Sequence, residues 1–152
     1  MSDSDSSIVI LGARRTPIGA FQGALSPVSA TALGSTAVAA AIADAGVAPA
    51  AVDEAVMGCC LFGGLDQAPA RQAVLGAGLP ASVPCSTVSK MCGSGMKAII
   101  QVHDALHAGH ATVGLAGGME SMSNAPYLLD RARSGYRLGH GRLLDHMFRD
   151  GL

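Results

Sequence analysis

The sequence contains few charged and few aromatic residues. Only 14% of its 152 residues are Asp, Glu, Lys or Arg, the formal net charge at pH 7 is −1, and tryptophan is missing. With 49% hydrophobic residues, the chain does not have the composition of a disordered protein, which combines low hydrophobicity with high net charge. The small net charge also argues against binding through a basic field, so we expect no nucleic-acid partner.

Long hydrophobic runs are missing as well. A membrane-spanning helix needs about 18 or more consecutive apolar residues, and the Ala-rich run 37–43 is stopped by Asp44. The opening segment 1–7 is polar and acidic, whereas a signal peptide opens with basic residues followed by an apolar stretch. We therefore expect a cytoplasmic location and no association with a membrane.

The cysteines show no spacing that indicates a metal site or a disulfide framework. They are Cys59, Cys60, Cys85 and Cys92, and no Cys-x-x-Cys pair occurs among them. His103 and His107 have the spacing of a zinc-binding helix, but such a site needs further ligands. Because both histidines fall at the edge of an apolar helix face, we interpret the segment as a packed helix and expect no metal.

Short apolar runs alternate along the chain with longer segments of helical periodicity. We predict strands over residues 8–13, 52–57, 83–88 and 111–116. We predict helices over residues 28–45, 67–77 and 92–108, the first with Ser26 as its N-cap and Gly46 at its C-terminal turn. This βαβαβαβ order indicates the α/β class, with a parallel sheet covered by right-handed crossover helices.

The pattern changes after Gly118. Residues 119–152 show no regular alternation, and they hold five of the ten basic residues, namely Arg131, Arg133, Arg137, Arg142 and Arg149. We therefore predict two parts, an α/β domain over residues 1–118 and a looser subregion or insertion over residues 119–152.

Cys92 is the candidate for chemistry. It stands between the predicted strand 83–88 and the helix predicted to begin at residue 92, and the carboxyl end of a parallel strand is where ligands bind in such sheets. The unpaired N–H groups and the dipole at a helix N-terminus favour a thiolate, and Gly93 and Gly95 would let a substrate approach closely. From the residues alone, a nucleophile and a packed core cysteine are equally supported, because no base accompanies the thiol.

The segment around Cys92 resembles the acyl-enzyme motif of the thiolase family. The resembling segment is Ser89–Ala98, and further segments resemble this family in the same order along the chain, with the last two typical of its bacterial acetyl-CoA acetyltransferase branch. These segments are Arg15–Phe21, Ala68–Ala73, Gly117–Tyr127, Tyr136–Gly141 and Asp145–Met147. Two positions depart from the family pattern: Ser89 stands where Asn is frequent, and Asp66 where Gly is common.

The resemblance implies a layered thiolase-like fold, of which residues 1–118 form the first βαβαβαβ half and residues 119–152 begin the inserted loop domain. It implies that Cys92 takes up an acyl group as a thioester, with its own N–H contributing to an oxyanion hole. The reaction is then condensation of two acetyl-CoA, or thiolysis of a 3-ketoacyl-CoA, in fatty acid metabolism. Leu152 falls at a position implied to contact coenzyme A, which enters as part of the substrate, so no separate cofactor is expected.

The resemblance also shows what these 152 residues lack. The family uses a His in a Gly-His-Pro motif to activate the thiol and a second Cys in a Cys-x-Gly-Gly-Gly motif as acid and base, and neither motif occurs here. The implied partners are therefore the C-terminal thiolase half, on the same or a separate chain, and further copies in a homodimer or homotetramer. The alternative is a catalytically silent thiolase-like subunit that binds acyl-CoA.

Overall fold

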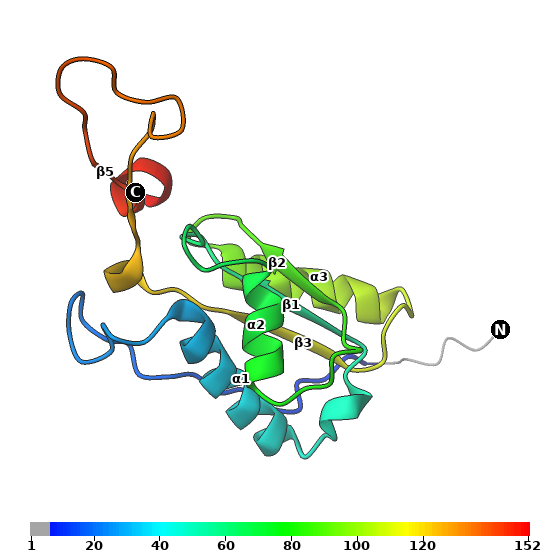
Figure 1. The fold of residues 1–152 in the computed structure, drawn as a ribbon. Coiled ribbons are helices and arrows are strands. Elements are labelled where there is room, and N and C mark those ends of the chain that lie inside the picture. Colours follow the sequence, from blue (N-terminus) through cyan, green and yellow to red (C-terminus); the bar gives the residue numbers. More distant parts are fainter. Residues whose placement is uncertain (1–6) are drawn as a thin grey trace.

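The computed structural model describes residues 7–152, and three helices and three strands form its main body (Figure 1). The helices are α1 (Ala30–Ala45), α2 (Pro69–Gly76) and α3 (Ser94–His107). The strands are β1 (Glu54–Gly58), β2 (Cys85–Val88) and β3 (Gly114–Gly118). In the part of the chain described, no helix has the length and apolarity needed to cross a membrane.

The three strands form one parallel sheet in the order β2-β1-β3. β1 lies in the middle, with Ala55 opposite Cys85 of β2 and Leu115 of β3. Parallel neighbours joined by crossover helices are the arrangement that the alternation of strands and helices predicts, so the α/β class is confirmed.

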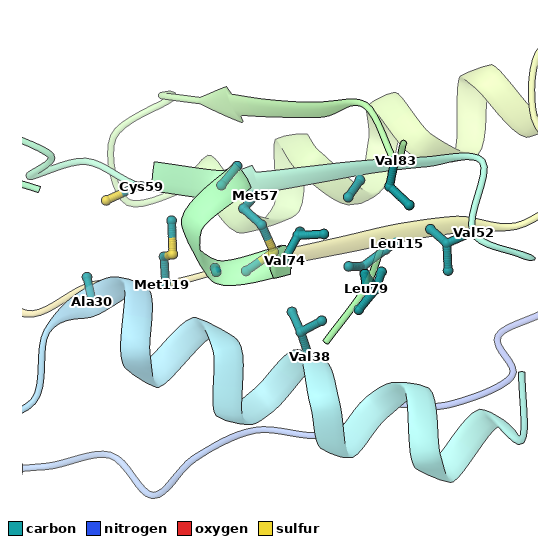
Figure 2. Packing of buried hydrophobic residues seen from close by; sticks show 13 residues of the cluster. Ala30, Val38, Val52, Met57, Cys59, Val74, Leu79, Val83, Leu115 and Met119 are labelled. Atoms are coloured by element: carbon teal, nitrogen blue, oxygen red, sulfur yellow. The ribbon is translucent and has the colours of Figure 1, made fainter. Parts of the chain in front are cut away.

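The side chains of β1 alternate between two helical layers. Ala55 and Met57 point into the larger core beneath α1 and α2, whereas Val56 packs with Ala98 and Val102 of α3 on the opposite face. Burial on both faces explains why the three central residues of the strand, 55–57, are all apolar. Figure 2 shows the larger core, where Met57 and Val74 are fully buried; burying a side chain of this size stabilises the fold by roughly 1.5–3 kcal/mol.

Small residues bring α1 close to its neighbours in this core. A Cβ added at Gly34 of α1 would come within 3.1 Å of the Ala73 Cβ of α2 and 2.8 Å of the Met119 sulfur. The lack of a side chain at position 34 therefore sets the distance between the two helices. The abundance of Gly and Ala in the sequence is in part a requirement of this close packing.

The predicted buried strand over residues 8–13 is wrong. The segment forms no strand, and the Ile10 side chain is 85% exposed. It runs along α1 instead, where Gly12 lies against the backbone of Ala41 and Ala45 and where Arg14 pairs with Asp44. The contacts that hold the segment are therefore those to α1 rather than ladder hydrogen bonds to a strand.

The element boundaries differ from the predicted ones by a few residues. α1 begins after Ser29, whose hydroxyl accepts a hydrogen bond from the Ala32 N–H at 3.2 Å, so Ser29 rather than Ser26 is the N-cap. Gly46 ends α1 in the left-handed conformation with φ of 64°, as predicted. β3 begins at Gly114, three residues later than the predicted strand.

Residues beyond β3 form short elements that the sequence did not predict. β4 (Tyr127–Leu128) and β5 (Leu144–Asp145) pair antiparallel, and a 3-10 turn (η2, Met122–Asn124) and a π-helical turn (η3, Met147–Gly151) flank them. In Figure 1 the segment between β4 and β5 extends away from the three-stranded sheet. The division at residue 118 remains a prediction, since these contacts do not define a domain boundary.

Asp53 fixes the amino end of the sheet, and its contribution to stability depends on pH. Its carboxylate accepts hydrogen bonds from the N–H groups of Thr112 at 2.7 Å and Val113 at 3.0 Å, and these bonds lower its pKa below the ordinary 3.8. A group with a lowered folded-state pKa stabilises the fold above its ordinary pKa and loses that contribution as the pH falls through the folded value. Asp53→Asn should therefore lower the unfolding temperature at pH 7, and the difference from the unsubstituted protein should shrink below about pH 3.8. Thermal unfolding at a series of pH values measures this; a difference that stays constant down to pH 2 would contradict it.

Candidate functional site

Cys92 lies just beyond the carboxyl end of β2, on the turn that joins this strand to α3. Its side chain is exposed, whereas Cys59 is buried and Cys60 and Cys85 are partly buried. The helix begins at Ser94 with Gly93 as its N-cap residue, so Cys92 precedes the helix instead of lying in its first turn as predicted. The reason is the tight turn before the helix, which uses residues 90–93.

This turn has a sharp bend at Met91, whose φ of 48° lies in the left-handed region. The N–H of Gly93 donates to the Lys90 carbonyl and the N–H of Ser94 to the Met91 carbonyl, both at 3.0 Å. For a residue with a side chain, such a conformation costs roughly 1–3 kcal/mol and persists only where the surroundings hold it. The turn therefore depends on its supports, and it presents Cys92 to solvent.

Ser94 is the main support of this turn. Its hydroxyl accepts a hydrogen bond from the Lys90 N–H at 2.8 Å and donates one to the Met91 carbonyl at 2.6 Å. The residue is 4% exposed, so both bonds are shielded from water. Ser94 thus ties the first turn of α3 to the bend immediately before Cys92.

Two glycines at the strand ends let the first turn of α3 pack directly on the sheet. A Cβ at Gly58 would come within 2.5 Å of the backbone N of Gly95, and a Cβ at Gly118 within 3.1 Å of the Gly95 Cα. Gly95 therefore faces the ends of β1 and β3, and the prediction that it opens a path for substrate is wrong. Gly93 has only the Lys90 carbonyl near it, at 3.4 Å from an added Cβ, and it is the glycine that leaves space beside Cys92.

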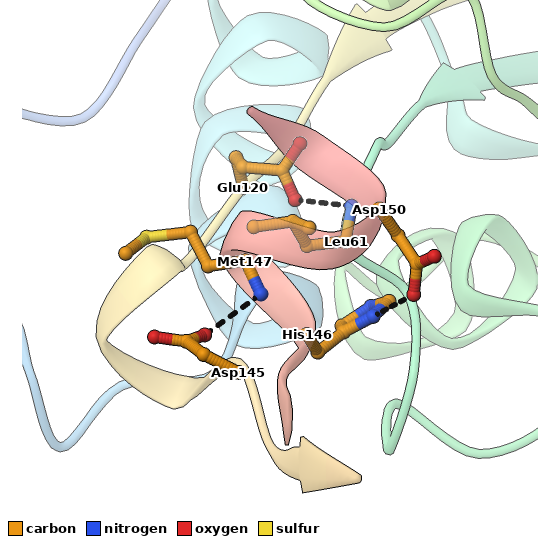
Figure 3. Close-up of polar contacts among 6 residues, drawn as sticks. All are labelled: Leu61, Glu120, Asp145, His146, Met147 and Asp150. Atoms are coloured by element: carbon orange, nitrogen blue, oxygen red, sulfur yellow. Dashed lines mark hydrogen bonds and ion pairs between the residues drawn. The ribbon is translucent and has the colours of Figure 1, made fainter. Parts of the chain in front are cut away.

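The loop after β1 lies against this turn and is held by Glu120. The Glu120 carboxylate accepts hydrogen bonds from the N–H of Cys60 at 2.7 Å and from the N–H of Leu61 at 2.9 Å, the second of which is drawn in Figure 3. The thiol of Cys59 contacts the same carboxylate at 3.5 Å. Burial, together with the Glu120 charge, raises the pKa of Cys59 to about 12. Burial also raises the pKa of Cys60, whose sulfur lies 3.6 Å from the Ser94 hydroxyl.

On its other side, the same loop contacts the C-terminal turn η3. His146 is 8% exposed, and its Nδ1 lies 2.6 Å from an Asp150 oxygen (Figure 3). A Cβ added at Gly63 would come within 2.9 Å of the His146 Nε2, so the ring packs against Gly63. A Cβ at Gly151 would meet the Leu61 side chain at 2.7 Å. The residues after β5 therefore help to fix the loop that follows β1.

Leu152, the other residue singled out from the sequence, ends the chain after η3 with 76% of its surface exposed. The described contacts do not bring it to Cys92. Its contact with coenzyme A remains a prediction.

The fold and the site together define an α/β protein whose exposed cysteine lies on a strand–turn–helix elbow at the carboxyl edge of a parallel sheet. Residues 8–152 match the family described as "Thiolase, N-terminal domain". The chain belongs to the thiolase family.

Proteins similar to this chain in sequence or in structure agree with this assignment. The chain is 54% identical to acetyl-CoA acetyltransferase 2 of Arabidopsis thaliana over 95% of its own length and 36% of the relative's. It is 54% identical to the mitochondrial acetyl-CoA acetyltransferase of Homo sapiens, again over 95% of its own length and 34% of the relative's. The crystal structure of the Acat5 thiolase from Ascaris suum in complex with coenzyme A matches with a TM-score of 0.90 and 39% identity, covering 94% of this chain and 37% of that one. The chain thus spans about a third of the length of these relatives.

Sequence reasoning did not single out Ser94 and Glu120 as parts of the site. Ser94 gives a signal, because a serine at the start of a helix can hydrogen-bond to backbone groups of the preceding turn. Glu120 gives a weaker signal: it lies two residues after Gly118, which ends β3 at the same edge of the sheet. Its hydrogen bonds to a loop 60 residues away are not encoded in any local pattern.

The close contact between β1 and α3 predicts unequal effects of two Gly→Ala substitutions. Gly58→Ala places a Cβ against the backbone of Ser94 and Gly95, which cannot move aside without lifting α3, so we expect a loss of about 3 kcal/mol or more of stability. Gly93→Ala meets only an ordinary contact at a φ of −90° and should change stability by less than about 1 kcal/mol. Denaturant unfolding of the full-length variants measures both; equal losses would refute the backbone contact as the reason for Gly58.

The four thiols should differ sharply in reactivity. With a pKa of about 12, only about one in 10,000 Cys59 thiols is ionised at pH 8, and the side chain is also buried. Cys92 is the exposed thiol of the four. We expect iodoacetamide at pH 8 to modify Cys92 first and Cys59 only after unfolding, as followed by mass spectrometry of peptides. Early modification of Cys59 in the folded protein would show that the loop after β1 is not held as described.

Proposed function

We propose that this chain is the N-terminal part of an acetyl-CoA acetyltransferase, with Cys92 as the residue that carries the acyl group. The observation that carries the proposal is the exposed Cys92 thiol on a supported elbow at the carboxyl edge of the sheet. The names of the acetyl-CoA acetyltransferases that are about 54% identical support the choice of acetyl-CoA as substrate.

In the proposed reaction the Cys92 sulfur attacks the carbonyl carbon of acetyl-CoA. The new C–S bond forms as the bond to the coenzyme A sulfur breaks, and coenzyme A leaves with a proton. A second acetyl-CoA, deprotonated at its methyl carbon, then attacks the acyl carbonyl; acetoacetyl-CoA forms and the Cys92 thiolate is released. The reverse direction is thiolysis of a 3-ketoacyl-CoA. In this reaction the Cys92 N–H contributes to stabilising the oxyanion.

The proton transfers require a base and an acid that these 152 residues do not include as family motifs. We propose that a C-terminal thiolase half supplies them and packs against α3. The outward face of α3 supports this, since Met96, Ile99 and Ile100 are 69%, 56% and 44% exposed there. An apolar helix face of this kind is typical of a surface covered by another protein layer.

The remaining properties are predictions of the same proposal. Coenzyme A enters with the substrate, Leu152 contacts it, and the protein assembles as a homodimer or homotetramer. The Ascaris suum thiolase was crystallised in complex with coenzyme A, which supports the first of these. A cytoplasmic location and a role in fatty acid metabolism rest on the sequence alone; residues 1–6, on which the location mainly depends, lie outside the described residues, and the human relative is a mitochondrial protein.

The proposal is tested by incubating the full-length protein with acetyl-CoA and analysing its tryptic peptides. Cleavage after Lys90 and Lys97 releases Cys92 in a peptide with no other cysteine, and this peptide should carry one acetyl group. Cys92→Ser should remove the label and lower thiolysis activity by at least about a thousandfold. Cys85→Ser, at the opposite end of β2, is the matched control and should retain both. A protein that binds acetyl-CoA without acetylation of Cys92 would favour the silent acyl-CoA-binding subunit instead.

A further inference from the structure

The Glu120 carboxylate is the far end of a chain of hydrogen bonds that leads to the Cys92 turn. Each of its oxygens accepts one backbone N–H, from Cys60 at 2.7 Å and from Leu61 at 2.9 Å. Glu120 itself is fixed, because only Met119 separates it from the end of β3 and the Met119 N–H donates to the Gly58 carbonyl at 2.9 Å. The carboxylate therefore sets the position of the residue that follows Cys59.

The Ser94 hydroxyl determines which group is the donor in its contact with the Cys60 thiol. It has one hydrogen, which it donates to the Met91 carbonyl, and two lone pairs, of which one accepts the Lys90 N–H. The remaining lone pair faces the Cys60 sulfur at 3.6 Å, so Cys60 is the donor in this contact. Partial burial raises the pKa of the Cys60 thiol, so the thiol keeps the proton that this bond requires.

We propose that Glu120 is a positioning residue for Cys92, acting through the Cys60 thiol and the Ser94 hydroxyl on the bend at Met91. Glu120 does not touch the reacting atoms. It holds the Cys60 loop so that all three hydrogen-bonding positions of the Ser94 hydroxyl are filled, and this stabilises the left-handed conformation of Met91. The expected loss of catalytic rate rests on the proposed function of Cys92. The expected displacement of the Cys92 turn does not rest on it.

The expected effect follows from the strain in the turn. Without full support of Ser94, the Met91 bend relaxes toward an ordinary conformation and moves the adjacent Cys92 backbone. A displacement of about 1 Å at a reacting group can lower a rate by about a hundredfold. Loss of the Glu120 carboxylate should therefore lower the rate at which the Cys92 sulfur reacts, while the affinity for substrate stays nearly unchanged.

Asp53 offers a matched control within the same sheet. Its carboxylate also accepts two consecutive backbone N–H groups, at 2.7 and 3.0 Å, but it precedes β1 and so lies at the opposite end of the strands from Glu120. In Glu120→Gln the new amide NH2 faces a backbone N–H where an oxygen accepted before, because each Glu120 oxygen accepts one of the two bonds. At Asp53 a single oxygen accepts both bonds, and the amide oxygen of Asp53→Asn can take its place. Both variants remove the negative charge from a carboxylate that binds two backbone N–H groups, at opposite ends of the sheet.

The test measures the rate at which iodoacetamide modifies Cys92 in the full-length protein, as a function of pH, together with kcat and KM for thiolysis and the unfolding temperature. We expect Glu120→Gln to lower the modification rate and kcat about tenfold or more, to change KM less than about twofold, and to shift the pH profile of modification. Asp53→Asn should change the rate at Cys92 less than twofold, even if it lowers the unfolding temperature as much. Equal slowing in both variants would overturn the proposal, because it would assign the effect to general stability.

Substitutions at Cys60 test the intermediate step in a protein that keeps Glu120. Cys60→Ala removes the donor to Ser94 and should slow modification of Cys92, whereas Cys60→Ser keeps an O–H donor and should restore most of the rate. Identical rates in these two variants would overturn the route through Cys60. Failure of the proposed function is separate: if the unsubstituted protein acquires no acetyl group, the modification rates still decide whether Glu120 positions Cys92.

Discussion

The structure depends on one contact, the backbone-to-backbone approach of the first turn of α3 to the ends of β1 and β3. Gly58 and Gly118 make it possible, since a Cβ at either position would meet main-chain atoms of the helix start. A helix on a sheet ordinarily rests on side chains that keep the two apart. Here the N-terminus of α3 contacts the strand ends directly. Cys92 precedes Ser94, the first residue of α3, by two residues and is therefore held at the edge where the parallel strands end.

The remaining features of the site follow from that contact. A helix start this close to β1 leaves little length for the connection from β2, and a short connection needs the sharp bend at Met91. The bend is stabilised by Ser94, which is available because it is the first helical residue and is buried against the sheet. The loop after β1 then fills the space beside Ser94, and Glu120 at the end of β3 holds that loop through its backbone.

Short-range patterns in the sequence predict those features of the site that depend on residues close together in the chain. The alternation of apolar runs and helical segments predicted the three parallel strands and the position of Cys92 after the third of its predicted strands. The run Ile8–Ala13 was wrongly assigned as a strand because hydrophobicity indicates burial or contact but does not identify the partner, and here the partner is α1. Asp66 stands where Gly is common in the thiolase family. Its φ of 62° lies in the left-handed region, which explains the preference for Gly at that position. Glu120 and Cys60 meet across 60 residues, and no short-range spacing specifies such a pair.

The groups that shape the site and the groups that can contact other molecules differ in their exposure. Every group that shapes the Cys92 turn lies within this chain and is buried or satisfied by hydrogen bonds, whereas Cys92 itself and the apolar outer face of α3 are open. A neighbouring base is one of the ways in which a thiol is activated as a nucleophile. Under the proposed function, the base of the C-terminal thiolase half would approach from the open side of the site, and the apolar face of α3 would provide the area against which that half packs. The hydrogen bonds of the Cys92 turn are formed within this chain and do not depend on that contact.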